Sequence, residues 1–122
     1  MRNCRLKKGY KEMSLEVALK SETEDPVLEL TGKIIDVDIK KLQHKMDQLY
    51  KKKSVERIVL DVTLANFIDS HGLGIIVYYH TLMQKESRKL IILNGNPDSE
   101  SYLNKLFELT NLDKVLNIVT AL

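Results

Sequence analysis

The chain has little of what disulfide-bonded, membrane-spanning or nucleic-acid-binding proteins need. Its only cysteine, Cys4, excludes an internal disulfide and fits a reducing compartment. No apolar run has the roughly 20 residues of a bilayer-spanning helix. The basic first residues are not followed by the apolar segment of a signal peptide. A net charge of +2 is too small to indicate nucleic acid as the main partner. We therefore expect a cytoplasmic protein.

The composition is typical of one soluble domain preceded by a short tail. Of 122 residues, 43% are apolar and 30% are charged, which is ordinary for a globular fold. Residues 1–12 are basic and poor in apolar side chains, so we predict a flexible tail there and a folded domain over residues 13–122. A membrane or nucleic-acid role for this tail stays open, although it has too few apolar residues for an interfacial helix.

The first half of the chain predicts a hairpin followed by a helix. Apolar and polar residues alternate over 15–20, a turn is expected at 24–26, and a second strand at 27–31 is expected to end at Gly32. Asp36 or Asp38 would then cap a helix that ends at the lysine run 51–53. The apolar positions of this helix keep helical spacing: Ile39, Leu42, Met46 and Leu49.

The second half alternates strands with helices, which predicts an α/β layer architecture with one open sheet covered by helices. The expected elements are a buried strand at 58–62, a helix from 70 to about 86, a strand at 90–93 and a loop at 94–97. A third helix, capped by Asp98 or Ser99, turns Leu103, Leu106 and Phe107 inward. Residues 115–119 fit either a short strand or a helical end.

The most informative segment is the run Asn66-Phe67-Ile68-Asp69-Ser70-His71-Gly72-Leu73-Gly74. An Asp-Ser pair before a helical apolar pattern indicates a helix start, with Ser70 as the expected N-cap. Free backbone N–H groups and the positive end of the helix dipole meet there, so a phosphate on this serine would be tolerated. Ser70 is therefore a helix cap, a phosphorylation site, or both.

Several neighbouring residues have two interpretations. Asp69 is either a partner contact or a turn or cap residue. Gly72 and Gly74 lack the third glycine of a phosphate-binding loop and are better explained by close packing against the sheet or a partner backbone. Tyr78, Tyr79 and His80 either flank a contact surface or pack against the sheet.

The same segment does not predict catalysis or metal binding. Ser70 and His71 are adjacent at a helix start and point in different directions, and the serine lacks the G-x-S-x-G elbow of hydrolases. The three histidines show no ligand spacing, so no metal is assigned. We expect a protein that is not an enzyme.

The octet from Phe67 to Gly74 resembles the F-[MI]-D-S-[ST]-G-[LI]-G motif of STAS domains, specifically of single-domain anti-sigma factor antagonists. Weaker resemblances in the same order and spacing support it, at residues 27–32, 57–62 and 106–112. The resemblance covers about residues 13–122. It implies the STAS fold, a mixed β-sheet with helices packed on it in a single domain.

The resemblance also implies a function. In that family the serine that matches Ser70 is phosphorylated by an anti-sigma factor that is an ATP-dependent serine kinase. The unphosphorylated antagonist binds this kinase, so that a sigma factor is released and transcription changes, and a phosphatase restores it. The antagonist needs no cofactor of its own, since ATP belongs to the partner. The expected partner-binding residues are Asp69, Ser70, His71, Gly72, Leu73 and Asp36.

Two positions depart from the family pattern. His71 stands where the family often has a second small hydroxyl residue. An ungapped alignment places Ile35 where the family tends to have an acid after the second strand, with Asp36 one position late. The departures leave a second hypothesis open. In it the chain is a constitutive scaffold or accessory STAS module of a signalling assembly or membrane transporter, and Ser70 is only a cap.

Overall fold

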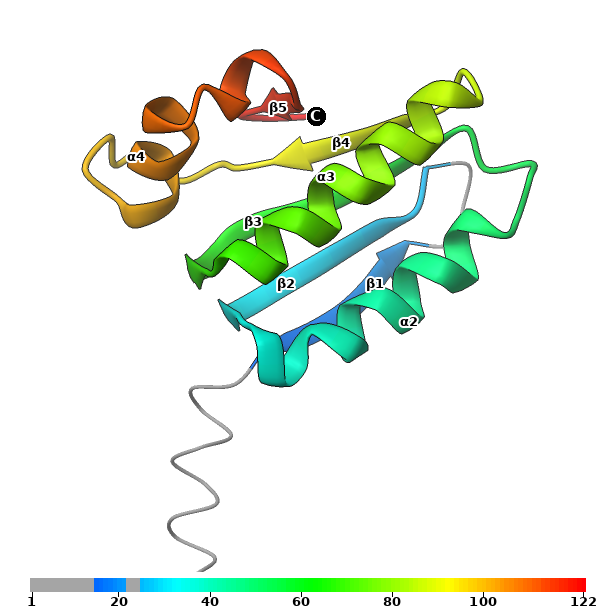
Figure 1. Ribbon diagram of the computed structural model, residues 1–122, viewed down its shortest axis with the longest axis horizontal. Helices are drawn as coiled ribbons and strands as arrows, with labels where there is room; N and C mark the ends of the chain where they lie inside the picture. The colour runs from blue at the N-terminus through cyan, green and yellow to red at the C-terminus, as the bar shows by residue number, and fades with distance from the viewer. Residues whose placement is uncertain (1–14, 22–24) are drawn as a thin grey trace, which may run out of the picture.

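A five-stranded mixed sheet in the order β1-β2-β3-β4-β5 forms the centre of the computed structural model (Figure 1), which describes residues 15–21 and 25–122. The strands are β1 (Glu16–Ser21), β2 (Val27–Ile34), β3 (Arg57–Ile68), β4 (Lys89–Leu93) and β5 (Asn117–Val119). The helices are η1 (Asp36–Asp38), α2 (Ile39–Tyr50), α3 (Ser70–Lys85), α4 (Tyr102–Leu109) and η2 (Leu112–Lys114). β1 and β2 form the predicted antiparallel hairpin, and all other pairs are parallel. The predicted tail at residues 1–12 lies outside the described residues.

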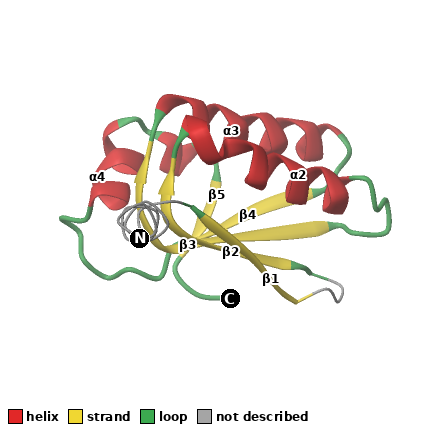
Figure 2. Ribbon diagram, turned by 90° about the horizontal axis from the view of Figure 1, so that it is seen from below, coloured by secondary structure: helices red, strands yellow, loops and turns green. Residues whose placement is uncertain are grey.

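The helices α2 and α3 cover the same face of the sheet (Figure 2), and the core lies between these two layers. Alternate residues of the central strands point toward the helices and are buried: Leu28, Leu30, Ile58, Leu60 and Val62. The four apolar positions predicted for α2 are all buried opposite them. The mixed sheet with helices packed on it, predicted from the resemblance and from the strand–helix alternation, is therefore confirmed.

The two strands that lead to the octet are longer than predicted. Gly32 has a φ of 98°, yet β2 continues through it to Ile34, so the predicted strand end at Gly32 is wrong. The register of the parallel pairing with β3 shifts between Gly32 and Lys33. Beyond this irregularity the pairing continues to Ile34 and Ile68. Both strands consequently end side by side, which brings η1 next to the start of α3.

Neither predicted cap of the first long helix acts as a cap. The helix α2 follows directly on η1, of which Asp36 is the first residue, and Asp38 stands at the N-cap position of α2 but makes no side-chain cap bond. The Asp38 carboxylate instead accepts a hydrogen bond from the Leu15 N–H (3.3 Å) and pairs with Lys41 at 3.3 Å. Asp38 therefore ties the start of β1 to α2.

The last helix begins later than predicted. Ser101, rather than Asp98 or Ser99, caps α4 by accepting a hydrogen bond from the Asn104 N–H at 3.3 Å. Of the three side chains expected to face inward, Leu103 and Phe107 are buried and Leu106 is partly buried against the core. The segment left open in the sequence forms β5, the edge strand beside β4.

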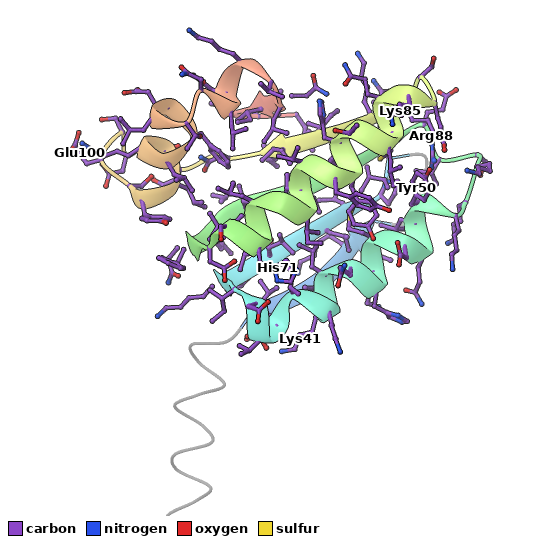
Figure 3. All side chains as sticks on the ribbon, viewed as in Figure 1. Lys41, Tyr50, His71, Lys85, Arg88 and Glu100 are labelled. Carbon is purple, nitrogen blue, oxygen red and sulfur yellow. The ribbon has the colours of Figure 1, made fainter. Side chains whose placement is uncertain are left out.

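A buried arginine joins the far ends of α2 and α3 (Figure 3). Arg88 is 7% exposed, and its guanidinium donates to the carbonyl oxygens of Val55 (2.8 Å), Tyr50 (3.0 Å) and Lys52 (3.2 Å). It also pairs with Glu86 at 2.9 Å. Hydrogen bonds from Tyr50 and Arg88 hold the pKa of the Glu86 carboxyl below its usual value. One side chain thus satisfies three carbonyls around the end of α2.

Candidate functional site

The start of α3 lies at the edge of the sheet where β3 ends. Asp69 is the N-cap residue, with extended backbone, and its carboxylate accepts a hydrogen bond from the Gly72 N–H at 2.8 Å. Ser70 is the first helical residue, so its predicted role as the cap is wrong: the neighbouring carboxylate already satisfies the helix N–H. Ser70 is exposed, and its hydroxyl makes no hydrogen bond among the described residues. Its oxygen is therefore available for reaction.

Asp69 also connects the two strand ends. Its second carboxylate oxygen accepts from the Asp36 N–H at 2.9 Å, and its own N–H donates to the Ile34 carbonyl at 3.1 Å. Partial burial raises the pKa of this carboxyl, but the hydrogen bonds from Gly72 and Asp36 and the nearby His71 outweigh burial and lower the pKa overall. Asp69 is therefore charged at neutral pH and fixed in place by backbone donors.

His71 and Asp36, the acid that stands one position after the aligned one, contact each other. The imidazole Nδ1 of His71 is in contact with the Asp36 carboxylate, and both side chains are exposed. Figure 3 shows His71 at the gap between the first turns of α2 and α3. Although Asp36 follows the aligned position by one residue, it lies within the site through its backbone contact with Asp69 and its side-chain contact with His71.

The two glycines of the octet differ in their surroundings. A Cβ atom added to Gly72 would lie 2.8 Å from the Ile34 carbonyl oxygen and 2.9 Å from side-chain atoms of Ile34 and Ile68. The predicted close packing is confirmed there. A Cβ added to Gly74 would meet nothing within 4 Å, so this glycine is not required by packing against the sheet. Leu73, between them, is partly buried against the core.

An aromatic pair at the end of β3 was not predicted as part of the site. Phe67 stacks on Tyr102 with ring centroids 4.8 Å apart, and the Tyr102 hydroxyl donates to the Ile68 carbonyl at 3.1 Å. Tyr102 remains 43% exposed. The helix α4 therefore borders the site, and the only signal in the sequence was the phenylalanine at the first position of the octet.

The three residues predicted as possible flanks of a contact surface divide between surface and core. Tyr79 and His80 are buried, and the Tyr79 hydroxyl donates to the Asp47 carboxylate of α2. Burial and this hydrogen bond raise the pKa of Tyr79. Tyr78 is 54% exposed on α3. Packing against the fold explains two of the three, and only Tyr78 is exposed.

The start of α3 exposes several polar side chains close together. Within residues 15–21 and 25–122, no hydrogen bond joins Ser70 to His71, and no group of three His, Cys, Asp or Glu side chains is placed to hold a metal ion. In the same part of the chain, no helix combines the length and the apolar character needed to cross a bilayer. What is exposed together is a free hydroxyl, an imidazole and a carboxylate at a helix N-terminus.

A family model described as the STAS domain matches residues 16–122. The chain belongs to the STAS domain family. In sequence, this STAS domain is similar to an anti-sigma F factor antagonist of Paenibacillus polymyxa, with 23% identity over 106 residues that cover 87% of each chain.

Solved structures share the fold of this STAS domain at low identity. An anti-sigma factor antagonist from Mycobacterium paratuberculosis aligns with a TM-score of 0.69 at 20% identity, covering 89% of this chain and 88% of that one. The Bacillus cell fate determinant SpoIIAA in its phosphorylated form aligns with a TM-score of 0.62 at 19% identity, covering 88% and 92%. The fold expected from the octet is thus the fold of these solved structures.

The charge of Asp69 predicts a pH dependence of stability. Because folding lowers the pKa of Asp69, its contribution is complete above its unfolded value of about 3.9 and is lost as the pH falls through the lower folded value. The Asp69→Asn variant should be less stable at pH ~7 and should lose less further stability below pH ~4. Urea unfolding of the wild type and the variant across this pH range measures the free energy of unfolding at each pH. Asp113→Asn, an exposed acid in η2, is the control, and parallel curves for wild type and Asp69→Asn would refute the prediction.

Proposed function

We propose that this STAS domain is an anti-sigma factor antagonist. When unphosphorylated it binds an anti-sigma serine kinase and thereby releases a sigma factor. Phosphorylation of Ser70 inactivates it, and a phosphatase restores it. The observation that carries the proposal is the free, exposed hydroxyl of Ser70 at the first position of α3, beside a cap already provided by Asp69. The antagonist names of similar proteins support it.

A phosphate on Ser70 would act by adding charge. The N-terminus of α3 favours an anion, so the fold tolerates the modification. The phosphate adds about −1.5 to −2 charges at neutral pH next to the carboxylates of Asp36 and Asp69. A partner surface with an acid opposite this patch would be repelled, and a desolvated unpaired charge costs several kcal/mol. Each ~1.4 kcal/mol lowers the affinity tenfold.

The proposed contact surface has exposed and supporting members. Ser70, His71 and Asp36 are exposed and would touch the kinase directly. Asp69 would orient them through its two backbone hydrogen bonds. Gly72 is buried and would act by letting the helix start approach the sheet. Leu73 is half-buried, and the surface continues along α3 past the open side of Gly74.

The first experiment is the intact mass of the protein recovered from its native host, with the Ser70→Ala variant treated in parallel and with co-purified proteins identified. A mass increase of one phosphate that disappears in Ser70→Ala, together with a bound serine kinase, would support the switch. If no growth condition gives a phosphate and other partners are recovered, the domain is a constitutive scaffold or accessory module, and the proposal is wrong.

A phosphate mimic gives a quantitative prediction. Ser70→Asp should weaken binding to the partner kinase at least about tenfold, while Ser70→Ala should bind like the wild type. Isothermal titration calorimetry measures the affinity, and circular dichroism should show an unchanged fold. Ser54→Asp places the same charge on an exposed serine after α2 and should leave the affinity unchanged. Equal affinities for Ser70→Asp and wild type would contradict the prediction.

A further inference from the structure

Two neighbouring hollows lie between the edge strand β1 and the helix α2, and Lys45 lines both of them. Their volumes are about 420 and 390 Å³. Val17 lines the first and Leu19 the second. These two residues pair with the fully buried Leu30 and Leu28, so they lie on the helix-covered face of the sheet, yet they are only partly buried. We call this feature the β1–α2 groove.

The strand beside the groove has a free edge. Among residues 15–21 and 25–122, the sheet pairs β1 only with β2, so no described strand covers the backbone groups of its outer side. The backbone of Leu15, just before β1, is already bonded: its N–H donates to the Asp38 carboxylate and its carbonyl accepts from the Lys41 ammonium. Unpaired edge backbone beside an apolar groove is the arrangement that accepts an extended segment of another chain.

The rim of the groove is basic, although the rest of the domain is acidic. Residues 39–54 hold six lysines, of which Lys41, Lys45 and Lys52 line the hollows. The one acid of this segment, Asp47, accepts a hydrogen bond from the Tyr79 hydroxyl. The remainder of residues 15–122 holds eight basic and fifteen acidic residues. Lys45 and Lys52 line the groove and form no ion pair within the described residues. Glu16 is the one acid along it, at the end where Lys41 also stands.

We propose that the β1–α2 groove is a docking surface for an acidic segment of a partner protein that carries apolar anchor residues. Five extended residues span about 16 Å, and the part of α2 and its end from Lys41 to Lys52 spans about the same length. The acidic side chains would pair with the lysines, and the anchors would cover Val17 and Leu19. This inference is independent of the phosphorylation of Ser70.

Other occupants fit less well. Residues 1–14 of the chain hold five basic residues and one acid, so the rim would repel them. A second copy would bring the same lysines against this rim. Nucleic acid would use the charge but leave the apolar floor uncovered, and a membrane would need apolar side chains that project from the surface rather than line a hollow. An acidic, partly apolar peptide uses both features.

Peptide selection tests the proposal without a known partner. A display library of random peptides of about twelve residues is panned on the full-length protein and counter-selected on the Lys45→Glu/Lys52→Glu variant. The selected peptides should be rich in Asp and Glu with interspersed Leu, Ile, Val or Phe. In fluorescence anisotropy, the double variant should bind them at least about tenfold more weakly. Lys105→Glu/Lys114→Glu makes the same charge change at exposed sites elsewhere and should bind normally.

Specific results would overturn the proposal. Selected peptides without acidic enrichment, or peptides that bind both double variants equally, would remove it. So would displacement of the peptides by phosphatidylglycerol vesicles or single-stranded DNA that bind the wild type more tightly. Circular dichroism confirms that each variant is folded. The Ser70→Asp variant should bind the peptides like the wild type, so a failure of the phosphorylation switch and a failure of the groove remain distinguishable.

Discussion

Replacing Gly72 with alanine should destabilise the protein by about 2–3 kcal/mol, since overpacking a close contact typically costs up to that amount. The added methyl group would meet the Ile34 carbonyl oxygen at 2.8 Å, and a strand carbonyl cannot turn aside as a flexible side chain can. The first turn of α3 would have to move away from β2. That movement would stretch the bonds of Asp69 to both elements, so binding of the partner should weaken together with stability.

Gly74 provides a matched control two residues away. Its substitution by alanine meets open space in the same helix and should stabilise the protein by about 0.5–1 kcal/mol, because glycine in a helix interior is unfavourable. Urea unfolding of both variants measures the difference. If Gly72→Ala were as stable as Gly74→Ala, the close approach of α3 to β2 would be wrong.

Removing the Arg88 side chain should have the other large effect on stability. Arg88→Ala leaves the carbonyls of Val55 and Tyr50 without this donor, while the Lys52 carbonyl keeps its bond from the Val55 N–H. A buried carbonyl left without its donor costs about 1–3 kcal/mol, so these two carbonyls predict a total of about 2–4 kcal/mol, to which the exposed Glu86 adds little. We therefore expect a loss of this size in the free energy of unfolding, measured by urea titration with circular dichroism.

Two variants test this explanation of Arg88. Arg88→Lys keeps the charge but lacks the planar fork that reaches three carbonyls, so it should recover only part of the loss. Arg57→Ala removes an exposed arginine paired with Asp25 at 3.4 Å and should cost no more than about 1 kcal/mol. A similar small cost for Arg88→Ala would show that the buried contacts contribute little.

The buried faces of the helices were predictable because helical spacing alone determines them. All four apolar positions of α2 are buried, and α3 spans nearly the predicted range. The strand ends were less predictable. Gly32 is a common sign of a turn, and only the pairing partner β3 shows that the strand continues past it. The residues around Gly32 give no information about β3, which lies far along the chain.

The structure brings several of the proposed partner-binding residues together, but the sequence did not give their structural roles. Asp69 and Ser70 are both good cap residues, and backbone geometry alone decides between them. The contact between Asp36 and His71 joins residues far apart in the sequence, at ends of strands whose lengths were underestimated. Arg88 had no signal at all, because an arginine between a serine and a lysine is typical of a solvent-exposed turn.

The strand order has a consequence for biosynthesis. Each strand of the sheet pairs with its neighbour in sequence, so the sheet can grow in one direction as the chain leaves the ribosome. The hydrogen bonds around Asp69 involve only residues 34–73 among the described residues, and these are made before β4, α4 and β5. The geometry around Ser70 can therefore form on the nascent chain, and Tyr102 joins it afterwards, when the last third of the protein emerges.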